Sequence, residues 1–300
     1  MSTALPFAFP PGLDTPTLLI DIDIVERNAD RMADEMERRG IALRPHTKTH
    51  KSVALARLQL EAGARGVTVG TLGEAEVLAD AGFIDIFVAY PVWAAGPKAE
   101  RLRALLARPS LRLGVGFDSA AGAERLAAAV AGAERQLEVL LEVDPGNRRT
   151  GVAPADAGPI AAVARAAGLE VVGLFTHGGH AYARPGAAAE AATDELEALS
   201  AAIASYETVG IQPRVVSAGS TPTALGAAAT PVTEVRPGTY LLGDRTQVAL
   251  GGSPADGVAI AIGATVVSAA VPGQVVIDAG AKTLTKDIQP YLVGYGGIAG

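Results

Sequence analysis

A short basic segment at residues 44–51 has the sequence RPHTKTHK and holds two of the chain's four histidines and two of its lysines. It follows an apolar run and precedes an Ala/Leu-rich helical pattern, so we expect a loop at the end of a strand. Burial and like charge would both lower the pKa of a lysine in such a loop. A lysine of lowered pKa is suited to form a Schiff base with a carbonyl group. The alternative interpretation is a solvated basic loop that binds an anion.

Polar residues also follow other apolar runs, at the points where further strands are expected to end. They comprise Tyr90 and the loops at 144–151, 176–182, 217–223 and 234–240. All four histidines lie either in the basic segment or in one of these loops, and they are His46, His50, His177 and His180. Because a core histidine usually stands alone on an apolar face, this grouping favours a functional site.

The loop at residues 217–223 has the sequence SAGSTPT and consists almost entirely of small residues. Free backbone N–H groups in such a loop can hold a phosphate, although the same composition is typical of a plain turn. We expect a phosphate to be bound by the backbone N–H groups of five residues, namely Gly219, Ser220, Thr221, Gly238 and Thr239. A Schiff-base lysine opposite a phosphate-binding loop suits pyridoxal 5'-phosphate, which carries an aldehyde and a phosphate.

Eight strand-like apolar runs alternate with helical patterns over most of the chain. The runs cover residues 41–44, 67–70, 84–89, 111–116, 137–143, 171–176, 214–217 and 233–235. The helical patterns cover residues 23–39, 53–62, 72–81, 97–107, 120–131, 154–167 and 187–209. This order predicts an α/β fold, a (β/α)8 barrel, whose active site lies at the C-terminal ends of the strands. A doubly wound open sheet is the competing architecture.

The tail of the chain has a different pattern. After residue 244 the helical periodicity stops, and residues 258–267, 274–277 and 291–293 are predicted strands joined by Gly/Pro turns. We therefore predict two domains, a barrel with an N-terminal β segment at 1–244 and a partial small β domain at 245–300. Because the final residues provide neither a cap nor a closing strand, we expect the full protein to continue beyond Gly300.

Composition excludes several classes of partner. The chain has 300 residues, 49% of them hydrophobic, and a formal net charge of -7, which argues against nucleic-acid binding. It contains no cysteine, which excludes disulfides and suits the cytoplasm. The segment Met1–Pro11 lacks the pattern of a signal peptide, and no apolar run reaches the roughly 20 residues needed to span a membrane. A small-molecule ligand fits these features best.

In combination these motifs resemble the D-threonine aldolase and D-serine dehydratase family, within the alanine-racemase-like barrel enzymes that use pyridoxal phosphate. The resemblance runs from about Thr15 to the end, and the basic segment is its most specific part. Supporting motifs are Asp144-x-Gly-x-x-Arg149-Thr-Gly, Thr176-His177-Gly-Gly-His180-Ala-Tyr182, Gly219-Ser220-Thr221-Pro222-Thr223, Val235-Arg236-Pro237-Gly238-Thr239-Tyr240 and Asp278-Ala-Gly-Ala-Lys282. The resemblance implies that Lys48, rather than Lys51, carries the cofactor as a Schiff base.

The resemblance further implies a lyase that acts on D-β-hydroxy amino acids and assembles as a homodimer. Family members bind a divalent metal through a histidine and a nearby cysteine or aspartate late in the β domain. This chain has no histidine after His180 and no cysteine. We therefore expect zinc or manganese only if the chain continues beyond Gly300, and the metal ligands stay unassigned.

Catalytic roles follow from this interpretation. Lys48 is the candidate base for the Cα proton, and the substrate hydroxyl is assigned to His50, His177 or His180. The remaining candidates for cofactor binding are His46, Arg149, Tyr182, Ser217 and Arg236. The two arginines are expected at the ring end of the cofactor, with ion pairs to Glu142 or Glu234 as the alternative.

Three other functions stay open. A racemase on the same fold needs a second acid/base residue, for which Tyr291 and Tyr295 are candidates. A non-catalytic pyridoxal-phosphate carrier would keep Lys48 and the phosphate loop but would leave the histidines of residues 176–182 without a role. A metal-dependent hydrolase would use the four histidines, but a lysine separates the pair in the basic segment, and this ranks last.

Overall fold

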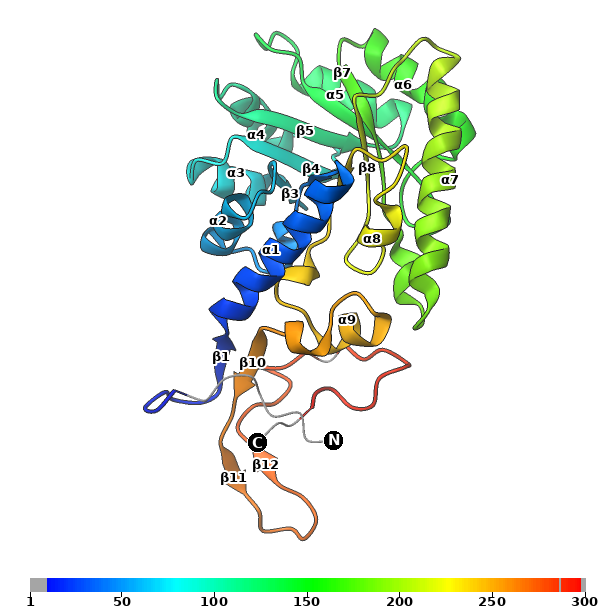
Figure 1. Ribbon diagram of the computed structural model, residues 1–300. Helices are drawn as coiled ribbons and strands as arrows, with labels where there is room; N and C mark the ends of the chain where they lie inside the picture. Colours follow the sequence, from blue (N-terminus) through cyan, green and yellow to red (C-terminus); the bar gives the residue numbers. More distant parts are fainter. Residues whose placement is uncertain (1–9, 286, 298–300) are drawn as a thin grey trace.

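The computed structural model describes residues 10–285 and 287–297. Eight parallel strands form its centre (Figure 1). They are β2 (Ala42–Leu43), β3 (Val67–Val69), β4 (Asp85–Pro91), β5 (Arg112–Phe117), β6 (Glu138–Val143), β7 (Glu170–Thr176), β8 (Val215–Ala218) and β9 (Glu234–Val235). The helices are α1 (Ile22–Arg39), α2 (Val53–Glu61), α3 (Leu72–Asp80), α4 (Pro97–Leu106), α5 (Ala120–Ala129), α6 (Ala157–Ala166), α7 (Ala187–Glu207), α8 (Ala224–Ala227) and α9 (Arg245–Leu250).

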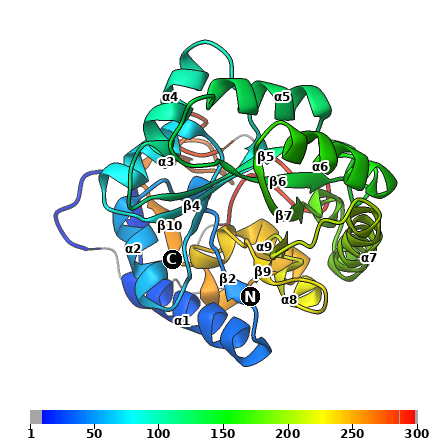
Figure 2. The same ribbon diagram turned by 90° about the horizontal axis from the view of Figure 1, so that it is seen from above.

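The sheet curls into a barrel with its helices outside, as the view from above shows (Figure 2). Its strand order is β2-β9-β8-β7-β6-β5-β4-β3. Backbone bonds join the two end strands: Arg65 N–H donates to Leu43 O at 2.9 Å and Thr68 N–H to Pro45 O at 2.8 Å. A parallel bridge between His46 and Thr68 continues this contact. The last junction of the barrel therefore lies directly beside the basic segment.

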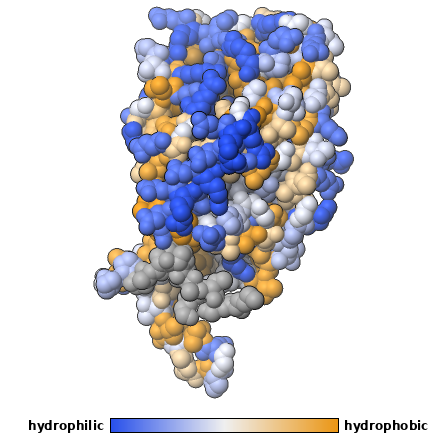
Figure 3. All heavy atoms as spheres, viewed as in Figure 1, coloured by the Kyte–Doolittle hydropathy of each residue, from blue (hydrophilic) through white to orange (hydrophobic). Residues whose placement is uncertain are grey.

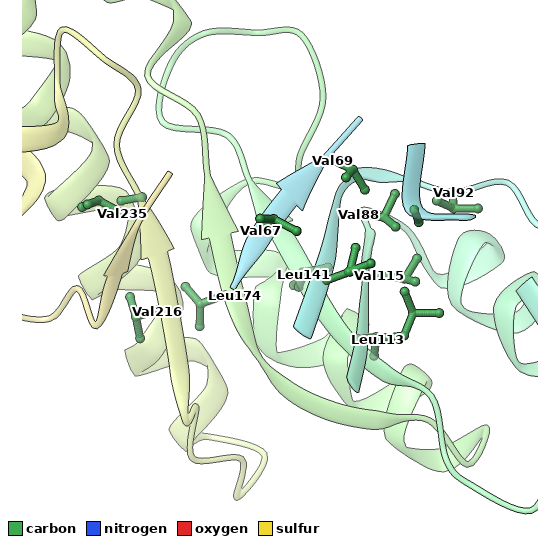
Figure 4. Packing of buried hydrophobic residues seen from close by; sticks show 14 of the residues in the cluster. Val67, Val69, Val88, Val92, Leu113, Val115, Leu141, Leu174, Val216 and Val235 are labelled. Carbon is green, nitrogen blue, oxygen red and sulfur yellow. The ribbon is translucent and has the colours of Figure 1, made fainter. Parts of the chain in front are cut away.

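Alternation along the strands divides the apolar residues between two cores. Residues that face outward pack against the helices, and Figure 4 draws part of this cluster, including Val67, Val88 and Leu174. The barrel interior holds a smaller cluster in which the rings of Phe87 and Phe175 meet edge to face at 5.2 Å. Such a thin interior core leaves the C-terminal end of the barrel open to polar residues.

The predicted barrel is confirmed, and the ends of the eight predicted strands differ from the observed ones by at most two residues. The helical prediction succeeded partly because several helices have local start signals, and α1 and α9 also end at a left-handed glycine. In α1, for example, Asp21 accepts the N–H of Ile24 at 3.1 Å, and Gly40 ends the helix in the left-handed conformation at φ 68°. The sequence pattern missed α8, whose four residues are too few to show a period.

The tail differs from its prediction in three respects. The predicted strand at residues 258–267 is divided into β10 (Ile260–Gly263) and β11 (Val266–Ser268), and β11 pairs with β12 (Val276–Ile277). The predicted strand at 291–293 is a turn, in which Leu292 N–H donates to Gln289 O at 2.9 Å. A short helix, α9, occupies residues where helical structure was expected to have stopped.

The N-terminal strand β1 (Thr17–Ile20) belongs to the small sheet at the tail. It pairs antiparallel with β10 over its whole length, from Thr17 opposite Gly263 to Ile20 opposite Ile260. The tail carries several exposed valines, and its lower end is predominantly apolar in Figure 3. No helix in the described part of the chain has the length and apolar character needed to cross a membrane.

Candidate active site

A cavity with about 520 Å³ of empty space, open mouth included, lies at the C-terminal ends of the barrel strands. Its lining combines the basic segment with residues from β4, β6 and β7 and from the loops that follow β6, β7, β8 and β9. The lining residues are His46, Lys48, Thr49, Ala89, Glu142, Arg149, Phe175, His177, Tyr182, Gly219, Ser220, Thr221, Arg236, Gly238 and Thr239. Three residues predicted for the site, His50, His180 and Ser217, do not line the cavity.

Lys48 lies in a single 3-10 turn, η1 (Thr47–Thr49), at the edge of the cavity. His46 caps this turn, with its Nδ1 accepting the N–H of Lys48 at 3.4 Å. Burial lowers the pKa of Lys48, and the nearby charges of Arg149 and Arg236 lower it further, whereas Glu74 opposes the shift. The lowered pKa expected from the sequence is therefore confirmed. The like charges, however, come from other strands and not from the basic segment itself.

Lys51 has different surroundings from Lys48. Its Nζ forms an ion pair with Glu74 Oε1 at 2.9 Å, and its side chain is 65% exposed. The other oxygen of Glu74 accepts the N–H of Gly70 at 2.8 Å, which ties the basic segment to the end of β3. The backbone of Lys51 has φ 50°, a conformation that is uncommon for a residue with a side chain. Lys51 thus fixes the loop, and only Lys48 lines the cavity.

Two histidines that line the cavity are held in the neutral form. Burial lowers the pKa of His177 to about 3, helped by the positive charges of Arg149, Lys48 and Arg236. Burial also lowers the pKa of His46 well below its ordinary value, with Lys48 and Arg236 adding to the effect. Near neutral pH both rings can accept a hydrogen bond, and neither adds a positive charge to the cavity.

The loops after β8 and β9 provide free backbone donors. The N–H groups of Thr221, Gly238 and Thr239 have no protein acceptor among the described residues. A side chain at Gly238 would place its Cβ 2.8 Å from His46 O, so only glycine permits this close approach. Three unpaired N–H groups in one cavity suit a phosphate, and together with Lys48 they fit pyridoxal phosphate.

Two other N–H groups of the predicted phosphate loop are already occupied. Gly219 N–H donates to Glu195 Oε1 at 3.1 Å, and Ser220 N–H donates to Thr223 Oγ1 at 2.8 Å. Gly219 has φ 78°, the left-handed conformation that favours glycine. These bonds hold the loop from behind. Of the five N–H groups predicted to bind phosphate, three are therefore available.

Arg236 lies on the floor of the cavity and is almost completely buried. Its guanidinium donates to the Ser217 hydroxyl and to the carbonyl of Thr176. It also lies 5.4 Å from the centre of the Phe175 ring, in a cation–π contact. Ser217 thus holds Arg236 in place and does not face the cavity. The alternative of a direct Arg236 ion pair with Glu234 is not observed, because Glu234 binds Arg44 and Ser217 instead.

Glu142 lines the cavity and is 2% exposed. One of its oxygens accepts the Thr150 hydroxyl at 2.9 Å and lies 3.7 Å from Arg149. Its other oxygen, Oε2, is buried and has no hydrogen-bond partner within the described residues. Burial raises the pKa of Glu142, against the opposing influence of Thr150 and Arg149. The ion pair that was the alternative for Arg149 is present, yet Arg149 also lines the cavity.

His50 points away from the cavity. Its Nδ1 accepts the N–H of Ser52 at 3.0 Å, and its Nε2 lies 3.3 Å from Gln59 Oε1. Gln59 in turn donates to the hydroxyl of Tyr240 at 3.0 Å. Both nitrogens of His50 thus take part in a partly buried series of hydrogen bonds beneath the loop. This geometry disagrees with a direct catalytic role for His50, because neither nitrogen is available to a ligand in the cavity.

The loop that carries His177 also places two other predicted residues. His180 Nε2 lies 3.0 Å from Asp194 Oδ2 on α7, outside the cavity lining. Tyr182 lines the cavity, and its carbonyl accepts the Tyr291 hydroxyl at 3.1 Å. Tyr291 of the tail therefore reaches the mouth of the barrel in the same chain. The second tyrosine considered for a racemase, Tyr295, is 60% exposed.

The described residues contain no cluster of three or more His, Cys, Asp or Glu side chains arranged to hold a metal ion. The four histidines therefore do not form the combined site that a metal-dependent hydrolase would need. Sequence reasoning also missed Glu195, which lies behind the phosphate loop. A signal was available, because Glu195 falls on the same helical face as Ala191, Ala192, Ala198 and Ala202, all of them buried.

Comparison with known proteins agrees with the fold. The chain is 38% identical over 283 residues to D-threo-3-hydroxyaspartate dehydratase from Delftia sp. (strain HT23), covering 92% of this chain and 73% of the relative. It is 32% identical over 303 residues to a D-threonine aldolase from Arthrobacter sp., covering 96% of this chain and 78% of the relative.

A solved structure of the Delftia dehydratase superposes with a TM-score of 0.83 at 36% identity, covering 92% of this chain and 74% of that chain. These relatives are lyases on an alanine-racemase-like fold that uses pyridoxal phosphate. The family model described as the alanine racemase N-terminal domain matches residues 20–246. The chain therefore belongs to the alanine racemase N-terminal domain family.

Proposed function

We propose that the protein is a pyridoxal-phosphate-dependent lyase that cleaves D-β-hydroxy amino acids, with Lys48 as the residue that carries the cofactor. The observation that supports this most strongly is the placement of Lys48 in one cavity with the free N–H groups of Thr221, Gly238 and Thr239. An amine of lowered pKa and a phosphate-sized set of donors match the two ends of the cofactor.

Pyridoxal phosphate supplies an aldehyde that condenses with amines and a ring that withdraws electrons from the substrate Cα. The protein has to supply the proton transfers and the orientation. The amine of Lys48 has a lowered pKa, which favours the neutral form, the form that can accept the proton from Cα. The buried charge of Arg236, fixed by Ser217 and Thr176, gives the floor of the cavity a permanent positive potential.

His177 is our candidate for the substrate hydroxyl. It lines the cavity, and its pKa of about 3 keeps the ring neutral, so that it can accept a hydrogen bond from that hydroxyl. With so low a pKa it is a weak base, and we assign it orientation of the hydroxyl instead of complete proton removal. Glu142, whose pKa is raised by burial, is the other group that can exchange a proton in the cavity.

The relatives favour a hydroxylated D-amino acid as the substrate. One is named a D-threo-3-hydroxyaspartate dehydratase and another a D-threonine aldolase. Both substrates carry a hydroxyl on Cβ, although the two reactions break different bonds. The same cavity can serve either reaction, because Lys48 and Arg236 act on the part of the substrate that is common to both.

Product analysis tests this proposal. The purified protein, loaded with pyridoxal phosphate, is incubated with D-threonine, D-serine or D-threo-3-hydroxyaspartate, with and without Zn²⁺ or Mn²⁺. Glycine and an aldehyde would identify an aldolase, and ammonia with an oxo acid would identify a dehydratase. Appearance of the L-enantiomer alone would identify a racemase and overturn the proposal. Lys48→Ala protein is the control for cofactor-independent turnover.

We also infer a cytoplasmic homodimer. The support is the exposed apolar surface of the tail, where Val266, Val267 and Val275 are each more than half exposed. An apolar surface of this kind is typical of a contact between subunits. Light scattering with size exclusion measures the mass in solution, and a monomeric mass at micromolar concentration would contradict the inference.

A further inference from the structure

Glu195 is a buried acidic residue for which the proposed reaction has no direct use. It lies on α7, the long helix at the side of the barrel in Figure 1, and it is 0% exposed. Its neighbours on that helix face are mostly alanines. A carboxyl group without contact with water is costly to bury unless it makes strong hydrogen bonds. The bonds that Glu195 makes therefore indicate its role.

Oε1 of Glu195 accepts two backbone N–H groups from two different loops. The first is Gly178, in the loop after β7, at 3.0 Å, and the second is Gly219, in the loop after β8, at 3.1 Å. Gly178 directly follows His177, and Gly219 is itself part of the cavity lining. A single oxygen thus joins two adjacent loops from outside the cavity.

Close packing makes this contact specific. A Cβ added to Gly178 would lie 2.8 Å from Glu195 Oε2, so a larger residue there would displace the carboxyl group. Oε2 itself is buried without a hydrogen-bond partner in the described structure. Burial raises the pKa of Glu195, whereas the Thr223 hydroxyl and the Gly219 N–H oppose the shift.

The phosphate loop is connected to Glu195 by a short series of bonds. After Gly219, the N–H of Ser220 donates to Thr223 Oγ1 at 2.8 Å, which closes a tight turn. Thr221 then accepts the N–H of Tyr240 through its hydroxyl at 3.1 Å, which links this turn to the loop that contains Thr239. The positions of the free N–H groups in both loops therefore depend on the position of Gly219.

We propose that Glu195 is a positioning residue for the cofactor phosphate: it fixes the loop after β8 by accepting the N–H of Gly219, so that the N–H of Thr221 stays directed into the cavity. This inference rests on the proposed function, because it concerns the same cofactor. It goes further by assigning the phosphate geometry to a helix residue that lies outside the cavity lining. Glu195 does not line the cavity and makes no contact with the cofactor in this proposal.

Comparison of two cofactor forms separates this role from a general effect on folding. Apoprotein is titrated with pyridoxal phosphate and with pyridoxal, which lacks the phosphate, and both Kd values are obtained from the change in absorbance. We expect Glu195→Ala to raise the Kd for pyridoxal phosphate by about tenfold or more, as expected for the loss of ordered donors. The Kd for pyridoxal should change by less than about twofold.

Two further variants keep the test decisive if Glu195→Ala folds poorly. Glu195→Gln retains an oxygen that can accept both N–H groups, and its Kd for pyridoxal phosphate should stay within about threefold of wild type. Glu195→Asp keeps the charge but is one methylene shorter, so it should behave like the alanine variant. Tyr206→Phe is the matched control, since it removes a buried hydroxyl bond from α7 to Gly173 O, far along the helix from Glu195.

Equal shifts in the two Kd values, or an unchanged Kd for pyridoxal phosphate in the alanine and aspartate variants, would overturn the positioning role. Glu195 would then only connect the two loops structurally, without an effect on phosphate binding. Wild-type protein that binds neither compound would refute the proposed function itself, and this inference with it. Wild-type protein that binds pyridoxal phosphate, combined with variants that also bind it normally, would refute only the role of Glu195.

Discussion

The two ends of the barrel use charge in opposite ways. Near the N-terminal end, acidic and basic residues at or beside the starts of β4 to β9 form ion pairs, and Arg44, which directly follows β2, joins them through its side chain. Arg44 binds Asp85 and Glu234, Arg112 binds Asp85 and Glu138, and Arg214 binds Glu170. At the C-terminal end, the cavity collects Lys48, Arg149 and Arg236, and the nearest carboxyl group to Arg149 is 3.7 Å away.

The unpaired groups at the C-terminal end show the difference most clearly. Oε2 of Glu142 and Oε2 of Glu195 are buried without partners in the described structure, and three N–H groups of the cavity have no acceptor there. Buried unsatisfied polar groups destabilise a fold, so their concentration at one end indicates a function. Paired charges at the other end stabilise the barrel that holds them. The N-terminal end thus stabilises the barrel, and the C-terminal end holds the groups that are available for chemistry.

The largest expected effect comes from the C-terminal end. Lys48→Ala should abolish the borohydride-sensitive absorbance band of the bound cofactor while changing the free energy of unfolding by less than about 1 kcal/mol, because a partly buried cation is removed from a positive environment. The band is recorded between about 410 and 430 nm, the range expected of this cofactor class.

Lys51→Ala is the matched control for that experiment. Lys51 binds Glu74 and is mostly exposed, so the band should remain. Loss of the band in Lys51→Ala together with its retention in Lys48→Ala would reverse the assignment of the two lysines.

The second effect concerns the N-terminal end, where we expect a substitution to lower the stability of the fold. Arg44→Ala leaves Asp85 and the buried Glu234 without their partner, and we expect it to lower the free energy of unfolding by about 3–5 kcal/mol. Arg214→Ala removes a more exposed pair and should cost less than about 1 kcal/mol. Urea unfolding of both apoproteins measures the difference. If both variants lowered the free energy of unfolding equally, burial of the ion pair would not determine its contribution to stability at this end.

The smallest effect is a pH dependence that originates in the cavity. The folded protein resists protonation of His177, whose pKa is about 3, whereas the unfolded chain takes up that proton near the ordinary value of 6.5. Stability should therefore fall as the pH decreases from 6.5 toward 3. The contribution of this residue has a maximal slope of about 1.4 kcal/mol per pH unit.

His177→Gln isolates this contribution, because glutamine does not titrate. The charged and titratable groups that face His177 are Arg149, Lys48, Arg236 and His180, and they are unchanged in the variant. Unfolding free energies of both apoproteins are compared between about pH 7 and pH 5. Parallel curves would show that His177 titrates alike in the folded and unfolded states, which would contradict its burial in a positive cavity.

The sequence predicted the barrel well for a physical reason. Each strand is a short apolar run that ends where glycine or polar residues begin, and each such boundary is local information. The residues that line the cavity follow from the same rule, because loops at the C-terminal ends of parallel strands meet. His46, Lys48 and His177 were found in this way, although His177 is far from the other two in the chain.

The rest could not be predicted because it depends on side-chain direction. His50 has the same spacing from Lys48 as His46, on the other side, yet one ring lines the cavity and the other binds Gln59. A glutamate on a helix is usually exposed, and only the alanine-rich face of α7 indicates that Glu195 is buried; the loops that it binds could not be predicted. The N-terminal strand β1 pairs with β10 in the tail, although almost the whole chain separates the two strands in sequence. No local sequence pattern indicates that contact.

The pairing of β1 with β10 also bears on how the chain is made. Thr17 lies opposite Gly263, so the first strand to leave the ribosome acquires its partner only when nearly all of the described chain has followed. At roughly 5–20 residues per second, this delay is on the order of ten seconds or more. Throughout that interval β1 presents an unpaired edge.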